Sequence, residues 1–391
     1  MCAKVLFVSN TNPAVSRFGA EQRSGNLLRA LINAGYSVDV AYVGLEKHDQ
    51  PQKTAGYNIV FWNEFGEQRF SSFENLKRIS TYKLYPHDSN LAHAIRNIIE
   101  RGNYEAIICR YLPTAYFCGL EKYADRLIVD MDDVPESALA AYLISEKSDF
   151  LHRIYHSLML YSVKRQTRRL ISKCATVFLA NGEDARKLGV ATLPNISQIE
   201  TAEVNHLTNN KSILFVGKLD FKPNVEGLNH FFANVWPRVI ESVNDAEIII
   251  AGMGLSDTLT KVWSKIPNVR LIGFVEDIKD FYSKGNIVVC PIYTGSGTNI
   301  KAIEAMAMGK ATLLSKFASK GIIEPTLKDK PCIIAENDHE MAARLQELLM
   351  DNTLCRSYQS MALAYSKKYF SLGQISYLLT DAIKDIKSKH K

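Results

Sequence analysis

The sequence predicts an α/β protein with two doubly wound parallel sheets, one in each half of the chain. Short apolar runs alternate with segments of helical periodicity along most of the 391 residues, as strands and helices do in such sheets. The alternation stops at a polar stretch, Ala191–Asn210, and restarts after it. The length also exceeds what one hydrophobic core usually serves. We therefore expect two Rossmann-like domains joined by a linker.

The first half begins with a βαβ pattern. Lys4–Ser9 is a short apolar run that ends in polar residues, which is typical of a buried strand. A helical pattern through Leu27 and Leu31 follows, Gly35 ends it, and Ser37–Val43 is the next strand. The further strands expected in this half are Tyr57–Trp62, Ala106–Cys109, Arg126–Asp130 and Thr176–Ala180. The further helices expected are Asn90–Arg101, Ala138–Ser172 and a short helix from Glu183.

The second half repeats this alternation. Its expected strands are Ser212–Gly217, Glu247–Ala251, Val269–Ile272, Ile287–Pro291, Ala311–Leu314 and Pro331–Ala335. Its expected helices are Val225–Val239, Ile278–Lys284, one within Pro291–Gly309, His339–Met350, Leu354–Tyr369 and Gln374–Ser388. The pattern divides the chain into a first domain at residues 1–192, a linker at 193–210 and a second domain at 211–369.

Composition excludes several classes of protein. A hydrophobic content of 47% and a charged content of 23% are typical of a globular protein, and a net charge of +6 is too low for a nucleic-acid binder. The seven cysteines include no CxxC pair, and the nine histidines form no HExxH motif, so the sequence indicates no metal site and no disulfide framework. The first residues show no leader pattern and no apolar run is long enough for a membrane span. We expect a cytoplasmic protein without a cofactor or metal.

The segment Pro291–Gly309, PIYTGSGTNIKAIEAMAMG, carries the clearest chemistry. Its glycines allow a tight turn, and Thr298 is expected to cap the helix that follows, where free N–H groups attract phosphate. Lys301 and Glu304 share one face near the start of that helix. A cation suits a phosphate and a carboxylate one turn further suits a sugar diol, which together indicate a nucleotide sugar. An exposed Lys301–Glu304 pair beside a simple turn is the alternative.

With its loops assembled, the chain resembles the GT-B glycosyltransferases of family 4, which include sucrose synthase and bacterial polysaccharide transferases. Four segments carry the resemblance: FVGKLDFKPNVEGL at Phe215–Leu228, AGMG at Ala251–Gly254, NVRLIGFVEDIKDFY at Asn268–Tyr282 and GSGTNIKAIEAMAMGKA at Gly295–Ala311. Leu193-Pro194-Asn195 is similar to the interdomain linker of that family.

The resemblance implies two Rossmann-like domains that face each other across a cleft, with a C-terminal helix at 370–391 crossing back to the first domain. It also implies a retaining, metal-independent transferase of the hexosyltransferase type (EC 2.4). The donor would be a nucleoside-diphosphate sugar and the acceptor a hydroxyl of a glycan or a lipid-linked glycan. Polysaccharide or lipopolysaccharide biosynthesis is the usual setting of such relatives.

The resemblance also implies roles for single residues. Glu304 corresponds to the second glutamate of the Glu-x7-Glu motif and would bind the donor ribose, whereas Ser296 stands where the first glutamate is expected. The residues implied in catalysis are Lys222 and Lys218, on the leaving diphosphate, and Asp133. The residues expected to bind the donor are Gly19, Gly217, Gly254, Phe274, Val275, Gly297, Thr298, Asn299, Lys301 and Glu304. The candidates on the acceptor side are Arg17, Arg110, Asp130 and Asp132.

Three alternatives stay open at this point. Ser296 makes a non-catalytic nucleotide-sugar binder credible, and a sugar-nucleotide epimerase of the same fold is a further class. The Asp-x-Asp that begins at Asp130 is typical of a metal site in another glycosyltransferase fold, but the double Rossmann pattern argues against that interpretation. The helix expected at Lys147–Arg169 mixes apolar and basic residues, so peripheral contact with the inner face of a membrane is open. A core-facing helix with a solvated basic face is the favoured interpretation.

Overall fold

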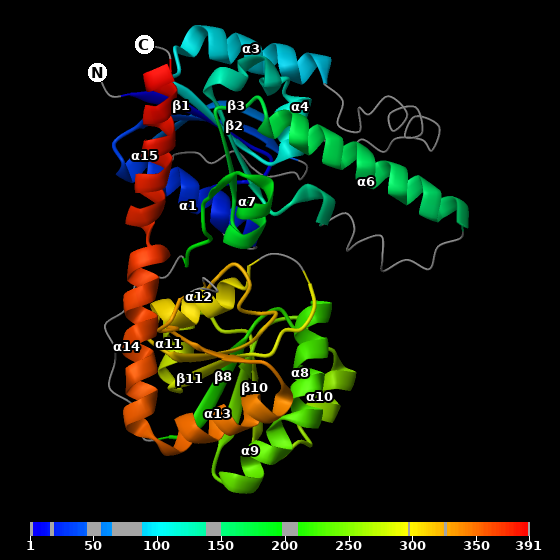
Figure 1. Ribbon diagram of the computed structural model, residues 1–391, viewed down its shortest axis with the longest axis vertical. Coiled ribbons are helices and arrows are strands. Elements are labelled where there is room, and N and C mark those ends of the chain that lie inside the picture. Colours follow the sequence, from blue (N-terminus) through cyan, green and yellow to red (C-terminus); the bar gives the residue numbers. More distant parts are fainter. Residues whose placement is uncertain are drawn as a thin grey trace. The chain divides into compact units, whose positions relative to one another are not determined.

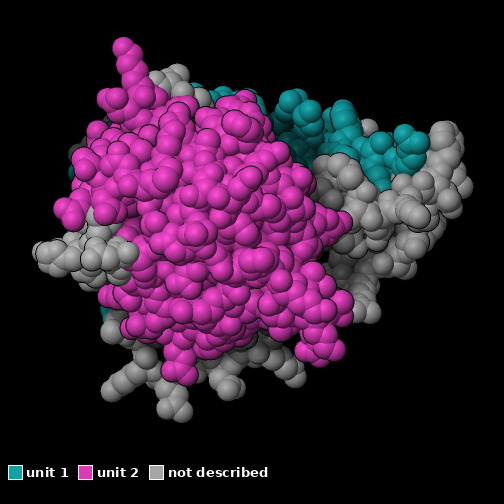
Figure 2. Space-filling model, turned by 90° about the horizontal axis from the view of Figure 1, so that it is seen from below, with its two compact units in different colours: residues 1–194, 372–391 teal, residues 195–371 magenta. Residues whose placement is uncertain are grey.

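The computed structural model divides the chain into two compact units, drawn as a ribbon in Figure 1 and coloured separately in Figure 2. Unit 1 comprises Met1–Pro194 with Leu372–Lys391, and unit 2 comprises Asn195–Ser371. The structure describes residues 3–15, 19–44, 56–64, 88–137, 150–197, 210–295, 298–323 and 327–389. Each unit is an α/β layer structure built on its own parallel sheet.

Unit 1 contains a seven-stranded sheet in the order β3-β2-β1-β4-β5-β6-β7, and all of its pairings are parallel. Its strands are β1 (Lys4–Ser9), β2 (Ser37–Gly44), β3 (Tyr57–Glu64), β4 (Ala106–Arg110), β5 (Leu127–Asp132), β6 (Thr176–Leu179) and β7 (Ala191–Thr192). Strand β7 extends the sheet into residues that the sequence assigned to the polar stretch. The direction of travel along the sheet reverses between β1 and β4, and ligands of such sheets bind beyond the strand ends at this switch point.

The helices of unit 1 lie on both faces of this sheet (Figure 1). They are α1 (Gly19–Asn33), α3 (Ser89–Gly102), α4 (Leu112–Phe117), the 3₁₀ segment η1 (Leu120–Arg126), α6 (Phe150–Ile171), α7 (Gly182–Leu188) and α15 (Leu372–Lys389). The sequence pattern did not predict α4 and η1, which are too short to show a helical period. Helix α15 lies beside α1, and the hydroxyl of Ser376 donates to the carbonyl of Ala30 at 2.9 Å.

Unit 2 contains a six-stranded parallel sheet in the order β10-β9-β8-β11-β12-β13. Its strands are β8 (Ser212–Val216), β9 (Glu247–Ala251), β10 (Val269–Gly273), β11 (Ile287–Cys290), β12 (Ala311–Ser315) and β13 (Ile333–Ala335). Five of the residues in β8 and β11 that face the core are completely or almost completely buried: Ile213, Leu214, Phe215, Val288 and Val289. The switch point of this sheet lies between β8 and β11.

The helices of unit 2 are α8 (Lys222–Asn234), α9 (Trp236–Ser242), α10 (Asp257–Trp263), α11 (Ile278–Ser283), α12 (Ile300–Ala307), α13 (Asp338–Met350) and α14 (Asn352–Tyr369). The sequence predicted one helix over Val225–Val239, and this was wrong: the chain forms two helices with a break at Val235. Pro237 explains the break, because proline fits the first turn of a helix but not its interior. Helix α10 was also not predicted.

Candidate functional site

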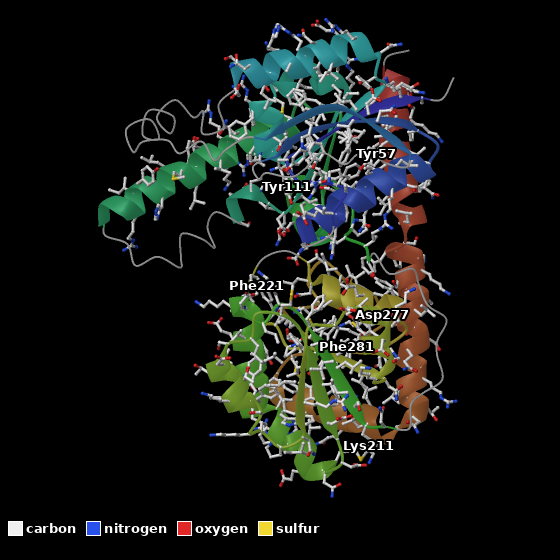
Figure 3. All side chains as sticks on the ribbon, turned by 180° about the vertical axis from the view of Figure 1, so that it is seen from behind. Tyr57, Tyr111, Lys211, Phe221, Asp277 and Phe281 are labelled. Carbon is white, nitrogen blue, oxygen red and sulfur yellow. The ribbon has the colours of Figure 1, made fainter. Side chains whose placement is uncertain are left out.

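Two loops meet at the switch point of unit 2. One follows β8 and leads into α8, and the other follows β11 and leads into α12. Phe221, labelled in Figure 3, precedes α8 at this end of the sheet, whereas Lys211 lies at the opposite end, before β8. The close packing of the loops depends on Gly227 of α8, because a Cβ there would lie 2.1 Å from the carbonyl oxygen of Pro291. The segments that the sequence singled out at 217–224 and 291–304 therefore form one site.

Glycines shape the backbone of this site. Gly252 follows β9 with a φ of +151°, and a Cβ there would lie 1.8 Å from the carbonyl oxygen of Gly217. At Gly217, a side chain would collide with two other side chains: a Cβ would lie 2.9 Å from Nδ2 of Asn224 and 3.0 Å from Nζ of Lys301. Gly254, with a φ of +87°, turns the chain beside Asp220. These contacts bring polar side chains close to the end of the sheet.

Lys301 lies in the first turn of α12 and is partly buried. Its Nζ donates to Oδ1 of Asn224 at 2.5 Å and lies 4.6 Å from the centre of the Phe215 ring. Among the described residues, no carboxylate lies within ion-pair distance of this ammonium, and Glu304 on the same helix face does not pair with it. Burial lowers the pKa of Lys301. The Glu304 carboxylate partly opposes this effect through its charge but does not contact the ammonium, so Lys301 is a desolvated cation without a direct ion pair among the described residues.

Glu304 is the second charged group of α12 at this site. Its carboxylate is partly buried, and it makes no hydrogen bond or ion pair with any side chain that the structure describes. Burial raises its pKa to about 7. The alternative of an exposed Lys301–Glu304 pair is therefore wrong, because the two groups are neither exposed nor joined. Both are free to contact a ligand.

The start of α12 differs from the expectation that Thr298 caps it. The helix begins at Ile300, the N-cap residue is Asn299, and neither the Asn299 amide nor another described side chain caps the helix. Asn299 instead donates through Nδ2 to the carbonyl oxygen of Ala318 at 3.3 Å. The hydroxyl of Thr298 is shielded from solvent and has no hydrogen-bond partner in the described part of the chain. Gly297 and Ser296 lie outside the described residues.

Lys218 and Lys222, the two lysines implied in catalysis, are far more exposed than Lys301. The Lys222 side chain is 77% exposed and lies 3.7 Å from the Glu226 carboxylate one turn along α8. The Lys218 side chain is 51% exposed and lies 3.5 Å from the carboxylate of Asp220. Each of these cations therefore has a carboxylate neighbour and is accessible to water.

The segment after β10 was expected to meet the nucleotide base. Gly273 ends the strand with a φ of +70°, and Phe274 follows with 63% of its surface exposed. Val275 packs against a buried cluster that contains Phe281, labelled in Figure 3. Phe274 is thus available for stacking, whereas Val275 anchors the loop.

Unit 1 has its own cluster of charged residues at the end of β4 and β5. Asp130 accepts hydrogen bonds from Nε and Nη2 of Arg23, at 2.8 and 2.6 Å, and from Nη1 of Arg110. All three side chains are at most 3% exposed. Burial by itself raises the pKa of Asp130, but the two guanidinium groups outweigh it and hold the pKa below its usual value.

This cluster corrects part of the acceptor-side expectation. Arg110 and Asp130 neutralise each other inside unit 1, so neither side chain is open to a sugar acceptor. The ring of Tyr111, labelled in Figure 3, stacks on the Arg110 guanidinium at 4.2 Å. Tyr111 has a φ of +68°, which is strained for an aromatic residue.

The acidic loop after β5 leads out of this cluster. Asp132 has a φ of +64° and lies 3.6 Å from Nε of Arg23 and 3.5 Å from Nη2 of Arg110. Asp133 follows it and is only partly exposed. Burial, together with the neighbouring Asp132 carboxylate, raises the pKa of Asp133 to about 6. Unlike Arg110 and Asp130, Asp133 is therefore accessible to a ligand.

The remaining expected residues of unit 1 are Gly19 and Arg17. Gly19 is the first residue of α1 and is exposed, so a ligand can reach its backbone. Arg17 lies outside the described residues. In the described part of the chain, no group of three histidine, cysteine or acidic side chains is arranged to hold a metal ion, and no helix is long and apolar enough to cross a membrane.

Sequence reasoning missed two residues of these sites. Asn224 was not singled out, although an asparagine in the first turn of a helix, where acidic residues are usual, is a weak signal of a special role. Arg23 was missed as well. No local pattern distinguishes it from an exposed arginine of an amphipathic helix.

The comparisons with known proteins agree with this architecture. Residues 210–351 match the family model described as "Glycosyl transferases group 1". An uncharacterized 44.6 kDa protein in the cps region of Klebsiella pneumoniae is 22% identical over 339 residues, which cover 82% of this chain and 84% of that protein.

Solved structures agree as well. Sucrose-phosphate synthase from Thermosynechococcus elongatus aligns over 99% of this chain and 100% of its own, with a TM-score of 0.68 and 13% identity. A TarM variant of S. aureus in complex with fondaparinux, α-GlcNAc-glycerol and UDP aligns over 75% of this chain and 58% of its own, with a TM-score of 0.52 and 14% identity. The fold is therefore GT-B, with two Rossmann-like domains, as the sequence predicted.

Proposed function

We propose that this chain, a glycosyltransferase of the GT-B type whose residues 210–351 form a group 1 glycosyltransferase domain, transfers a sugar from a nucleoside-diphosphate sugar to a hydroxyl acceptor. The observation that carries the proposal is the pair Lys301 and Glu304 at the switch point of unit 2. Among the described residues, the cation has no direct ion pair and the carboxylate has no hydrogen bond, although each charge acts on the other through space. A nucleotide sugar supplies both missing partners, a diphosphate and a ribose diol.

Separate residues at this end of the sheet are available for the ribose, the base and the diphosphate of the donor. Glu304 accepts hydrogen bonds from the ribose hydroxyls, and its elevated pKa falls when those donors and the diphosphate-bound lysine surround it. The exposed ring of Phe274 stacks on the base. The first backbone N–H groups of α12 and the Thr298 hydroxyl donate to the diphosphate oxygens. This arrangement supports a donor of nucleoside-diphosphate length.

In the proposed reaction, the acceptor oxygen forms a bond to the anomeric carbon while the bond from that carbon to the diphosphate oxygen breaks. The departing diphosphate takes the proton of the acceptor hydroxyl, and attack from the same face retains the anomeric configuration. Negative charge builds on the leaving group, so lysines and helix N–H groups that face it lower the barrier. We propose that these groups suffice without a metal ion.

We propose a glycan or lipid-linked glycan as the acceptor, in the biosynthesis of a surface polysaccharide. The relative from a cps region supports this setting. In unit 1, Asp133 is the residue that we assign to the acceptor hydroxyl, because its side chain is partly exposed beside the buried arginine–aspartate cluster. For a lipid-linked acceptor, we propose that the protein also contacts the inner face of the membrane that holds the lipid.

The test begins with the donor. Thermal-shift and calorimetric binding are measured with UDP, GDP, ADP and their common sugars, with and without EDTA. We expect one nucleotide to stabilise the protein in both conditions, Glu304→Ala to abolish this effect, and Glu241→Ala, an exposed carboxylate on α9, to leave it unchanged. Binding that disappears with EDTA would contradict metal independence, and unchanged binding by Glu304→Ala would contradict the ribose role.

Transfer is then tested with the bound donor and a panel of glycan acceptors. We expect release of the nucleoside diphosphate together with a product that has the anomeric configuration of the donor. Tight donor binding without transfer to any acceptor of the panel would instead favour the non-catalytic binder. A product of inverted configuration would overturn the retaining mechanism.

A further inference from the structure

Lys301 and Asn224 form a polar pair between two segments that lie 77 residues apart in the sequence. Asn224 is buried, with 5% of its surface exposed, and both ends of its amide are engaged. Oδ1 accepts from Lys301 Nζ, and Nδ2 donates to the carbonyl oxygen of Lys218 at 2.7 Å. The same side chain therefore holds the loop after β8 and the ammonium from α12.

We propose that Lys301 is the principal cation for the donor diphosphate and that Asn224 positions the Lys301 ammonium. This inference rests on the donor site proposed above. The exposed lysines Lys218 and Lys222 then act as secondary contacts. This assignment reverses the ranking that resemblance to other glycosyltransferases implies.

The first argument is electrostatic. Lys301 is removed from water, and its direct contacts among the described residues are a neutral amide and an aromatic face, whereas the Glu304 carboxylate acts on it only from beyond ion-pair distance. A buried cation without a direct ion pair costs folding free energy, so its place is best explained by an anion that arrives with the ligand. Lys222 has Glu226 as a neighbour and is 77% exposed, and water screens its interaction with any phosphate.

The second argument is steric. The absence of a Cβ at Gly217 leaves room for both polar groups, since that atom would lie 2.9 Å from Asn224 Nδ2 and 3.0 Å from Lys301 Nζ. Gly217 directly follows the strand β8 at the switch point, where ligands bind beyond the ends of parallel strands. The chain thus leaves space for Lys301 at the position where the diphosphate binds.

The third argument concerns the type of residue at position 224, which accepts the hydrogen bond from Lys301. A carboxylate at position 224 would neutralise the ammonium and compete with the phosphate. An amide holds the same atom in place through one hydrogen bond and leaves its charge for the ligand. Asn224 therefore acts through Lys301 and has no direct contact with the donor in this proposal.

The experiment compares Lys301→Met with Lys265→Met, a matched substitution of an exposed lysine that follows α10. Binding of UDP, GDP, ADP and their nucleosides is measured by calorimetry, and the unfolding midpoint of the ligand-free protein is recorded. We expect Lys301→Met to weaken diphosphate binding by roughly 10- to 100-fold, the range for loss of a charge-assisted hydrogen bond. The ligand-free midpoint establishes that the variant is folded before its binding is compared, because the substitution removes a buried charge but also leaves Oδ1 of Asn224 without its hydrogen-bond donor.

Asn224→Asp tests the positioning role without a loss of volume. It offers Lys301 a carboxylate and also loses the Nδ2 donor to the Lys218 carbonyl oxygen, so we expect a folded protein of lower stability whose affinity for the diphosphate falls about 10-fold while its affinity for the nucleoside is kept. A role in folding alone would weaken both ligands equally. Lys222→Met, in contrast, should weaken the diphosphate less than Lys301→Met does.

The outcomes separate this inference from the proposed function. If the wild type binds none of the nucleotides, the donor site itself is wrong. If the wild type binds a diphosphate and Lys301→Met binds it equally well, the donor site stands and the role of Lys301 is overturned. A larger loss with Lys222→Met than with Lys301→Met would also overturn it.

Discussion

Arg23 and Asp130 are separated by 107 residues in the chain, yet they form a two-point ion pair inside unit 1, at 2.8 Å from Nε to Oδ2 and 2.6 Å from Nη2 to Oδ1. Arg23 also donates to the carbonyl oxygen of Leu193, at the end of the first domain, at 2.7 Å. One buried guanidinium therefore connects α1, β5 and the segment that follows β7. This pair holds the acidic loop that contains Asp133.

Breaking this pair should destabilise unit 1 strongly. Asp130→Asn leaves two buried guanidinium groups without their main counter-ion, so we expect a loss of about 3–5 kcal/mol in the free energy of unfolding. The measurement is urea unfolding followed by circular dichroism, with Asp381→Asn, an exposed site on α15, as the control.

The effect of this pair on the free energy of unfolding should depend on pH. Because the folded pKa of Asp130 is depressed, its contribution to stability is present above the unfolded carboxyl pKa of about 3.9 and is lost as the pH falls through the lower folded value. The difference between wild type and variant should therefore shrink below about pH 4. A loss near zero at pH 7 would refute the role of the pair.

Two glycines of the proposed donor site should respond differently to alanine. At Gly217 the added Cβ meets the ends of the Asn224 and Lys301 side chains, which can move, so we expect a folded protein with weaker donor binding. At Gly252 the Cβ would lie 1.8 Å from a backbone oxygen at a φ of +151°, so Gly252→Ala should cost about 3 kcal/mol of stability. Unfolding midpoints and donor affinity, measured on both variants, check this contrast. Equal stability of the two variants would contradict it.

Glu304 should make the stability of the ligand-free protein depend on pH. Its folded pKa, about 7, is raised above the ordinary value of about 4.3, so ionisation in the folded state is unfavourable. Stability is therefore expected to fall as the pH rises from about 4 to 7, and Glu304→Gln should remove this slope and gain of the order of 3 kcal/mol at pH 8. Unfolding midpoints at a series of pH values test this, with Glu241→Gln as the matched exposed control. If Glu304→Gln kept the slope of the wild type, the raised pKa would be refuted.

Asp133 should act in transfer and leave donor binding unchanged. A carboxylate that orients the acceptor by accepting a hydrogen bond from a hydroxyl beside the attacking one must be ionised, so the transfer rate is expected to rise through the Asp133 pKa of about 6. Asp133→Asn should lower kcat/KM about 10- to 100-fold and flatten this rising limb. Rates from pH 5 to 8 and donor affinity from calorimetry are compared for wild type, Asp133→Asn and Asp381→Asn. A flat wild-type profile, or an equal loss of donor affinity, would exclude this role.

Much of the fold could be predicted from local patterns. The apolar runs predicted as strands at Lys4–Ser9 and Ile287–Pro291 are buried parallel strands in the structure. A strand that is buried on both faces is a continuous apolar run, so it can be recognised from its own residues. The patterns failed where tertiary contacts or a single residue decided the outcome. Pro237 divided an expected long helix, and the short α4 and η1 lacked enough turns to show a period.

At the proposed donor site, the residue types and their order could be predicted from local pattern: a glycine turn, then Lys301 and Glu304 on one helix face, at the carboxyl end of a strand. Which cations are solvated and which is buried could not be predicted, because that depends on Asn224, Phe215 and Gly217 from a distant segment. The same holds in unit 1, where Arg110 and Asp130 looked available from the sequence but neutralise each other once Arg23 packs beside them. Local sequence therefore shows which charged groups are present. Their burial and their ion pairs depend on side chains that lie far away in the sequence.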